Sequence, residues 1–133
     1  MNYILTTCCK DKDTSKGLMP AIKRYLNPRI GYVYGISKSR GIPMLIFSGK
    51  FGILKPEEKI PYYDLRLEKG MVFDMTNKVI NQLKTYKIDE ICFYGLDENK
   101  HPDWQPYYSV IEKVCTFLNI KLKKAYLNKP VYE

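Results

Sequence analysis

The residues best suited to chemistry begin at residues 48–52, which read Ser-Gly-Lys-Phe-Gly. Ser48 offers a hydroxyl, Lys50 offers an ammonium, and Gly49 allows a ligand to approach the backbone closely. Such a turn suits a phosphate or a carboxylate. It is not a Walker loop, because the Gly-x-x-x-x-Gly-Lys-Ser/Thr order is missing. The alternative is a tight turn in which Ser48 bonds local backbone groups and Lys50 is solvated.

A second candidate is the run Tyr62-Tyr63-Asp64 in the same stretch of chain. Asp64 can hold a water molecule for attack at a sugar carbon or accept a hydrogen bond from a base, and a tyrosine ring can stack on that base. A structural role is the alternative: Asp64 caps a turn or pairs with a nearby cation, and the tyrosines close the core.

Polar or small residues also follow two other apolar runs. Thr7 and Cys8 come after the first run of the chain, and Tyr94 and Gly95 end the run that begins near residue 88. Side chains of this kind at strand ends can line a ligand site. We therefore add these four residues to the candidate site.

Metal chemistry is not expected. His101 is the only histidine, which excludes a site with several histidines, and the four cysteines lack the spacing of metal ligands. We expect no metal and no other cofactor, and we interpret the cysteines as reduced thiols. His101 is interpreted as a solvated loop residue or a general acid or base, and Asp97 or Glu98 is open as a second carboxylate.

Short apolar strands alternate with helical patterns along the chain. The expected strands cover residues 3–5, 44–48, 88–94 and 120–127, and the expected helices cover residues 17–26, 28–41, 70–86 and 106–118. Residues 49–67 show neither period and predict a long loop, whereas residues 128–133 have no clear class. The alternation predicts an α/β fold with a single three-layer domain over residues 1–133: a four-stranded, mainly parallel sheet with helices on both faces.

Ligands of such sheets bind at the carboxyl ends of the strands, where the strand order reverses. The strand exits at residues 6–10, 48–52 and 94–101 should therefore meet. The predicted catalytic residues are Asp64 and Ser48, and the predicted ligand-binding residues are Thr7, Cys8, Gly49, Lys50, Tyr62, Tyr63, Tyr94 and Gly95.

Charge favours a polyanionic partner. The chain has 22 Lys and Arg against 14 Asp and Glu, a net charge of +8, and 12 tyrosines that can stack on bases. A generic lysine-rich surface is the alternative. No apolar run is long enough to span a membrane, and the N-terminus lacks a leader, so we expect a cytoplasmic protein without a membrane partner.

Several of these motifs resemble those of known protein families. Residues 46–54, Pro56 and residues 60–65 resemble a family of small, uncharacterised bacterial, archaeal and phage domains that reads Leu-Ser-Ala-Lys-Tyr-Gly-Leu-Leu, then Pro, then Pro-Tyr-Asp. They resemble more distantly the YaaA peroxide-stress family. The sequence departs from the pattern at Gly49, where the small domains often have Ala, and in having two tyrosines before Asp64.

The resemblance implies an architecture similar to that of uracil-DNA glycosylase and a connection with nucleic acids or nucleotides. We therefore expect a nucleic-acid- or nucleotide-associated protein. If it is an enzyme, a hydrolase or transferase of the glycosylase type acting on the N-glycosidic bond of a nucleobase is expected. A non-catalytic DNA- or RNA-binding module and a small-ligand sensor are the alternatives.

Overall fold

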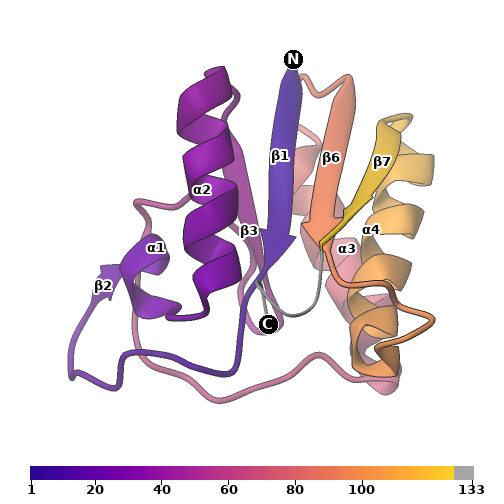
Figure 1. Cartoon of the computed structure of the whole chain (residues 1–133). Coiled ribbons are helices and arrows are strands. Elements are labelled where there is room, and N and C mark those ends of the chain that lie inside the picture. The colour runs from indigo at the N-terminus through magenta and orange to yellow at the C-terminus, as the bar shows by residue number, and fades with distance from the viewer. Residues whose placement is uncertain (128–133) are drawn as a thin grey trace.

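The computed structural model describes residues 1–127 and shows an α/β fold built on a five-stranded sheet in the order β4-β3-β1-β6-β7 (Figure 1). The strands are β1 (Asn2–Thr7), β3 (Met44–Ser48), β4 (Gly52–Leu54), β6 (Glu90–Gly95) and β7 (Lys121–Tyr126). Every neighbouring pair is parallel except β3 and β4, which are antiparallel. The predicted α/β class and the mainly parallel sheet are thus confirmed.

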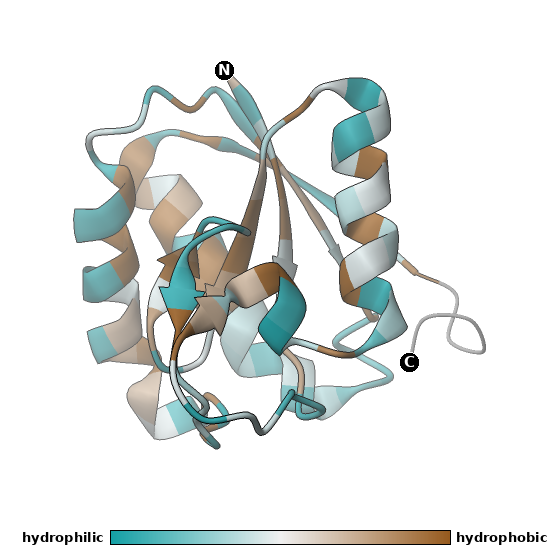
Figure 2. Ribbon diagram, turned by 90° about the vertical axis from the view of Figure 1, so that its left-hand side faces the viewer, coloured by the Kyte–Doolittle hydropathy of each residue, from teal (hydrophilic) through white to brown (hydrophobic). Residues whose placement is uncertain are grey.

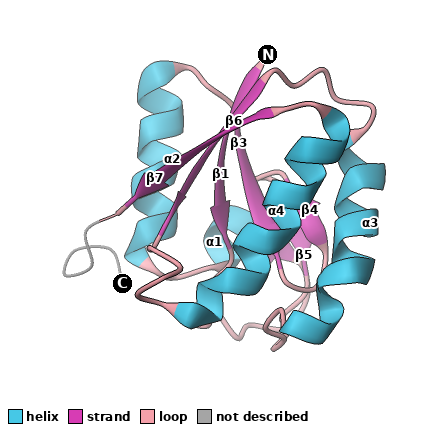
Figure 3. Ribbon diagram, turned by 90° about the vertical axis from the view of Figure 1, so that its right-hand side faces the viewer, coloured by secondary structure: helices cyan, strands magenta, loops and turns pink. Residues whose placement is uncertain are grey.

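Helices lie on both sides of the sheet, with α2 on one side and α3 and α4 on the other (Figure 3). Their bounds are α1 (Ala21–Arg24), α2 (Pro28–Arg40), α3 (Val72–Leu83) and α4 (Gln105–Leu118), and short 3-10 turns, η1 (Lys69–Met71) and η2 (Pro102–Trp104), precede α3 and α4. Within residues 1–127, none of the helices has the length and apolar character needed to cross a membrane.

The ends of α2 follow from its sequence. The side chain of Asn27 accepts a hydrogen bond from the backbone N–H of Arg29 at 2.9 Å, and Pro28 suits the first helical position. Gly41 ends the helix with φ of +65°, a left-handed conformation that glycine adopts without steric cost. The prediction of a helix at residues 28–41 is confirmed.

Two sequence predictions need correction. The sheet has five strands rather than four, because residues 49–67 are not one loop: the chain turns at residues 49–51, and β4, which begins at Gly52 with φ of +76°, pairs antiparallel with β3. A second small ladder pairs β2 (Met19–Pro20) with β5 (Lys59–Ile60). The helix predicted at residues 17–26 is only the single turn α1, because residues 19–20 pair with β5 instead. Residues 128–133 lie outside the described part of the chain.

Apolar residues of the strands and helices form one buried core. Figure 2 shows these hydrophobic residues in brown along the strands and on parts of the helices. On the side of α3 and α4, Phe47 packs edge to face on Tyr107, and Phe93 stacks on Tyr108. On the other side, Ile30 and Val33 of α2 are fully buried against the sheet. This packing fixes both helical layers relative to the strand ends.

The connections that leave β1 and β6 run to opposite sides of the sheet. The chain leaves β1 for α2 and then β3, whereas it leaves β6 for α4 and then β7. Because β1 and β6 are neighbours, their carboxyl ends form the point where strand order reverses. This edge of the sheet is the expected place for a ligand.

Candidate functional site

A cavity of about 500 Å³ lies at this edge of the sheet. It is lined by the exit of β1, the start of α2, residues 64–66, the exit of β6 and the start of α4, namely Thr7, Cys8, Cys9, Lys10, Lys12, Asn27, Arg29, Asp64, Leu65, Arg66, Leu96, Asp103, Trp104 and Tyr107. The volume is in the range of cavities that hold small molecules.

Arg29 is the most unusual residue of the lining, because its side chain is charged and only 3% of the residue is exposed. Its Nη1 donates to Thr6 Oγ1 at 2.7 Å and to the carbonyl of Thr7 at 2.9 Å, and its Nη2 donates to the carbonyl of Cys8 at 3.1 Å. All three acceptors are uncharged. Within residues 1–127 the guanidinium forms no ion pair with a carboxylate.

The fold places Arg29 by means of the cap of α2. Asn27 and Pro28 start the helix directly beside the end of β1, so the first turn of α2 directs Arg29 at the strand exit. The guanidinium also lies 4.8 Å from the ring centroid of Trp104. Burial lowers the pKa of Arg29 from its ordinary value, although it remains a cation at neutral pH.

The lining carries more positive than negative charge. Lys10, Lys12, Arg29 and Arg66 face two carboxylates, Asp64 and Asp103. Except for Arg29, these charged side chains belong to exposed or half-buried residues at the rim. An anion that enters the cavity would therefore meet a cationic rim above a buried guanidinium.

Three of the predicted site residues, Thr7, Cys8 and Asp64, line the cavity. Ser48 does not, because it is fully buried: its Oγ lies 2.8 Å from the Tyr63 hydroxyl and accepts backbone N–H groups of Lys50 at 3.1 Å and Phe51 at 3.0 Å. These contacts match the structural alternative for this turn.

Tyr62 and Tyr63 point in different directions. Tyr63 is buried and its hydroxyl lies 2.5 Å from that of Tyr25, whereas Tyr62 is 45% exposed. Burial raises the pKa of Tyr63 and of Tyr25 well above the ordinary value, so both hydroxyls stay protonated. Lys50 is exposed and lies over the Phe51 ring at 5.5 Å, outside the cavity lining.

Gly49 and Gly95, the two glycines among the predicted site residues, pack against aromatic residues of the cavity lining. A Cβ atom on Gly49 would lie 2.9 Å from the Tyr107 hydroxyl, and one on Gly95 would lie 2.5 Å from the Trp104 ring. Their lack of a side chain thus lets two lining aromatic residues pack closely. Tyr94 is buried away from the lining, and its carbonyl accepts a hydrogen bond from Thr6 Oγ1 at 2.8 Å.

Two thiols reach the lining. Cys8 Sγ lies 3.8 Å from the Tyr107 hydroxyl, which accepts the backbone N–H of Leu67 at 3.0 Å. Cys9 Sγ donates to the carbonyl of Asp11 at 3.1 Å, and burial raises the pKa of this thiol. The part of the chain that the structure describes contains no cluster of three or more His, Cys, Asp or Glu suited to a metal ion.

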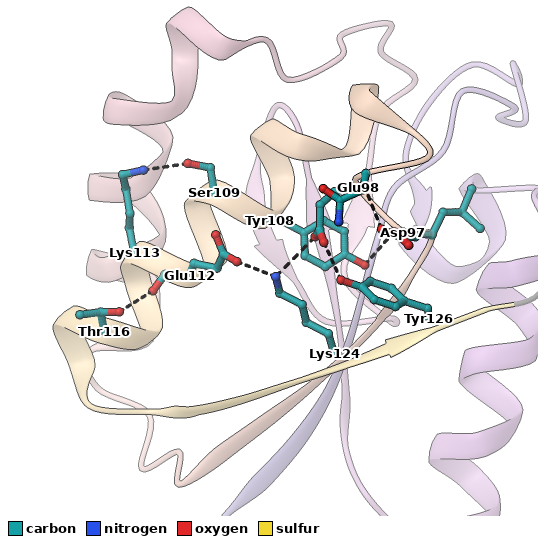
Figure 4. A network of polar contacts seen from close by, with 11 residues as sticks. Asp97, Glu98, Tyr108, Ser109, Glu112, Lys113, Thr116, Lys124 and Tyr126 are labelled. Carbon is teal, nitrogen blue, oxygen red and sulfur yellow. Dashed lines mark hydrogen bonds and ion pairs between the residues drawn. The ribbon is translucent and has the colours of Figure 1, made fainter.

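Glu98, one of the two residues left open as a second carboxylate, belongs to a polar network outside the cavity lining (Figure 4). Glu98 accepts a hydrogen bond from the Tyr126 hydroxyl at 2.5 Å and lies 3.5 Å from Lys124, which also pairs with Glu112 at 2.6 Å. Tyr108 donates to the carbonyl of Leu96 at 3.0 Å. The network holds the exit loop of β6 against β7 and α4.

The remaining loop candidates are structural in their contacts. Asp97 accepts the backbone N–H of Asn99 on its side chain at 2.9 Å, and its carbonyl accepts the backbone N–H of His101 at 2.9 Å. His101 precedes η2 and is half-buried. Neither residue belongs to the cavity lining.

Sequence reasoning missed Arg29, Trp104 and Tyr107. The sequence predicts a helix from residue 28, and the available signal is that Arg29 stands in the first turn of this helix, α2. Trp104 and Tyr107 lie around the start of α4, where aromatic residues at helical spacing favour a core interpretation.

Comparison of the chain with protein-family models, with curated proteins and with solved structures finds no significant match.

Proposed function

We propose that the chain binds a nucleotide, either free or as a unit of a nucleic acid, in the cavity with its phosphate directed at Arg29. The observation that carries the proposal is a buried guanidinium that lines a cavity and bonds only uncharged acceptors within residues 1–127. A buried charge is costly unless it is paired, and arginine binds phosphate with directed, charge-assisted hydrogen bonds. A phosphate would supply the missing partner.

Burial of an arginine alone would not support phosphate binding, as Arg24 illustrates. Arg24 is fully buried too, but it donates to four carbonyls, those of Asp13, Ser15, Gly17 and Ile60, and it does not line the cavity. Its role is to hold loops together. Arg29 differs because it borders a space large enough for a ligand.

The rest of the lining is compatible with a nucleotide. Lys10 and Arg66 add positive charge at the rim, and Leu65 and Leu96 add apolar surface for a sugar or base. The resemblance of residues 46–65 to the small phage and bacterial domains and to the YaaA family favours the same class of ligand.

Trp104 provides a direct test, because it is the only tryptophan of the chain and lines the cavity. We expect nucleoside monophosphates to change its fluorescence, and the corresponding nucleosides to bind at least about tenfold more weakly, a difference of about 1.4 kcal/mol. Inorganic phosphate should compete. Equal binding of nucleoside and nucleotide would overturn the proposal.

Variants of the charged residues test whether Arg29 binds the phosphate. Arg29→Lys keeps the charge but loses the planar fork of donors, so it should weaken nucleotide binding about tenfold or more. Arg66→Gln at the rim should have a smaller effect, and Lys84→Gln, an exposed residue at the end of α3, should have none. Thermal unfolding of each variant shows whether the fold is intact.

A second candidate function is cleavage at an N-glycosidic bond. It is favoured by the position of Asp64, which is exposed to water and also lines the cavity. Base release from nucleosides, nucleotides and oligonucleotides can be measured by chromatography. Asp64→Asn should abolish it while Trp104 fluorescence still reports binding, and Asp74→Asn on α3 should leave it unchanged. Absence of base release by the wild-type protein would reject catalysis and leave the binding proposal in place.

A further inference from the structure

The positive charge of the chain is concentrated in one segment. Residues 14–56 contain eight Lys and Arg and no Asp or Glu, while the rest of the chain carries the other 14 basic residues and all 14 acidic ones. The segment includes α1 and α2. The whole net charge of +8 therefore arises from a segment that contributes Asn27 and Arg29 to the cavity lining.

One flank of α2 runs from the cavity along the sheet. Arg29, Val33, Ile36 and Arg40 follow at intervals of four, three and four residues, so they share one side of the helix. Arg29 lines the cavity at one end of this row, and Arg40 is exposed at the other. The 13 residues of α2 span about 20 Å.

This flank of α2 borders a part of the sheet that has no helix over it. α2 packs on β1 and β3, and among residues 1–127 no helix lies in front of β6 and β7 on that side (Figure 1). In the β6–β7 ladder Lys123 is the register partner of Cys92, and Arg40, in the last turn of α2, also lies near enough to the Cys92 thiol to lower its pKa, which burial raises. Arg40 and Lys123 therefore lie near the same point of β6.

Strand β7 borders the uncovered part of the sheet on the side away from α2. Side chains alternate along a strand, and Lys124 points toward α4 because it pairs with Glu112 at 2.6 Å. Lys121 and Lys123 therefore point to the opposite side, the side of α2. Both are more than half exposed, and both lie 3.8 Å from a single carboxylate, that of Glu90. The positive charge is thus only partly compensated.

We define the basic sheet face as Tyr32 and Arg40 of α2, Cys92 of β6, and Lys121 and Lys123 of β7. Tyr32 is 43% exposed on α2, and it and Arg40 both lie close enough to Tyr94 to act on its hydroxyl. The face thus combines three cations with an exposed aromatic ring. This combination is typical of surfaces that bind single-stranded nucleic acid through its phosphates and unstacked bases.

We propose that the basic sheet face binds an extended single strand of DNA or RNA whose next nucleotide occupies the cavity. The inference rests on the proposed function, since it extends the ligand from one nucleotide to a strand. A single strand fits better than a duplex because the cavity volume of about 500 Å³ suits one nucleotide rather than a base pair.

The test compares two triple variants of the full chain. Arg40→Gln/Lys121→Gln/Lys123→Gln removes the cations of the basic sheet face. The matched variant, Lys78→Gln/Lys84→Gln/Lys113→Gln, removes three exposed cations from α3, its C-cap and α4, on the other side of the sheet. Fluorescence anisotropy measures binding of labelled oligo-dT and oligo-U of about 10 nucleotides. Trp104 fluorescence measures binding of a nucleoside monophosphate to the same proteins.

We expect the first variant to weaken binding of at least one oligonucleotide about tenfold and to reduce the slope of log affinity against log salt by about 2, as expected for three lost phosphate contacts. Mononucleotide binding should stay unchanged in both variants, and the matched variant should bind strands like the wild type. Equal loss in both variants, or preference for a duplex of the same length, would overturn the inference. Absence of mononucleotide binding by the wild type would instead reject the proposed function.

Discussion

The hydroxyl of Tyr63 lies 2.8 Å from Oγ of Ser48, and this buried contact joins the loop at residues 61–67 to the end of β3. The same hydroxyl lies 2.5 Å from that of Tyr25, next to α1. Tyr63 thus holds the loop that carries Asp64, Leu65 and Arg66 to the cavity. Ser48 and Tyr63, two of the predicted site residues, thus lie outside the cavity lining and fix the loop that borders it.

Tyr63→Phe should destabilise the protein and loosen the cavity. The substitution removes the shared hydroxyl and leaves the buried Ser48 and Tyr25 hydroxyls short of a partner, which costs about 1 to 3 kcal/mol. Urea denaturation measures the loss. The exposed neighbour gives the control: Tyr62→Phe should change stability by less than about 0.5 kcal/mol. Similar losses in the two variants would contradict the anchoring role.

Gly49→Ala should also be destabilising. The added methyl group would lie 2.9 Å from the Tyr107 hydroxyl and 3.0 Å from the backbone nitrogen of Leu67, so a cavity-lining ring and the loop must move. Overpacking of this kind costs about 1 to 3 kcal/mol. Calorimetry should show a lower Tm.

The control for Gly49→Ala is a substitution at Gly35, a glycine with room for an added methyl group. A Cβ on Gly35, in the middle of α2, meets nothing within 4 Å. Gly35→Ala should therefore raise stability by about 0.5 to 1 kcal/mol, because alanine has the higher helix propensity. A loss of stability at Gly35, or a gain at Gly49, would show that the packing around these positions is not as described.

Arg24→Met should cost about 3 kcal/mol or more. It removes the donors of four carbonyls, at distances between 2.7 and 3.1 Å, that tie residues 13–17 to β5. Lys23→Met, at the exposed neighbouring position, should change stability little. Denaturation of the two variants in parallel separates the loss of this hydrogen-bond cluster from a general effect of removing one charge.

Stability should fall in alkaline solution, and Cys115 should account for part of the fall. Burial raises the pKa of Cys115 from 9.0 to about 12. Above pH 9 the unfolded thiol loses its proton while the folded one keeps it, so folding binds more protons and stability decreases as pH rises, by up to about 1.4 kcal/mol per pH unit. Below pH 9 this contribution is fully present.

Cys115→Ala isolates that contribution. The variant should start from a lower stability at pH 8, because a buried side chain is truncated, but its stability should decline less steeply between pH 9 and 11 than that of the wild type. Urea unfolding at each pH gives both slopes. Parallel curves for the two proteins would show that Cys115 makes no such contribution.

Much of the fold could be predicted because its signals are local. The strand at residues 44–48 is a short apolar run, and α2 is bounded by Asn27, whose side chain caps the first turn, and by Gly41, whose backbone adopts the left-handed conformation. Strand β4 and the β2–β5 pair were not predicted. Strands of two or three residues are too short to show an alternation of apolar and polar residues, and they form only because a partner strand lies beside them.

The site was predicted less completely. Of the predicted site residues, Thr7, Cys8 and Asp64 line the cavity, and Thr7 and Cys8 do so because they follow β1 at the edge of the sheet where the cavity lies. Ser48 and Tyr63 have the same chemistry in the sequence, but they are buried against each other. A sequence pattern specifies which groups are available, whereas exposure depends on how loops pack.

By itself, the sequence determined the α/β alternation, the ends of α2, the excess of positive charge and the region of the strand exits, because each depends on residue type and spacing. Only the tertiary structure decided that Arg29 borders the cavity and Ser48 does not, and that Arg40, Lys121 and Lys123 share one side of the sheet. The physical reason is that these contacts join residues far apart in the chain. Which side of the sheet a helix or a side chain occupies is fixed only when the sheet assembles.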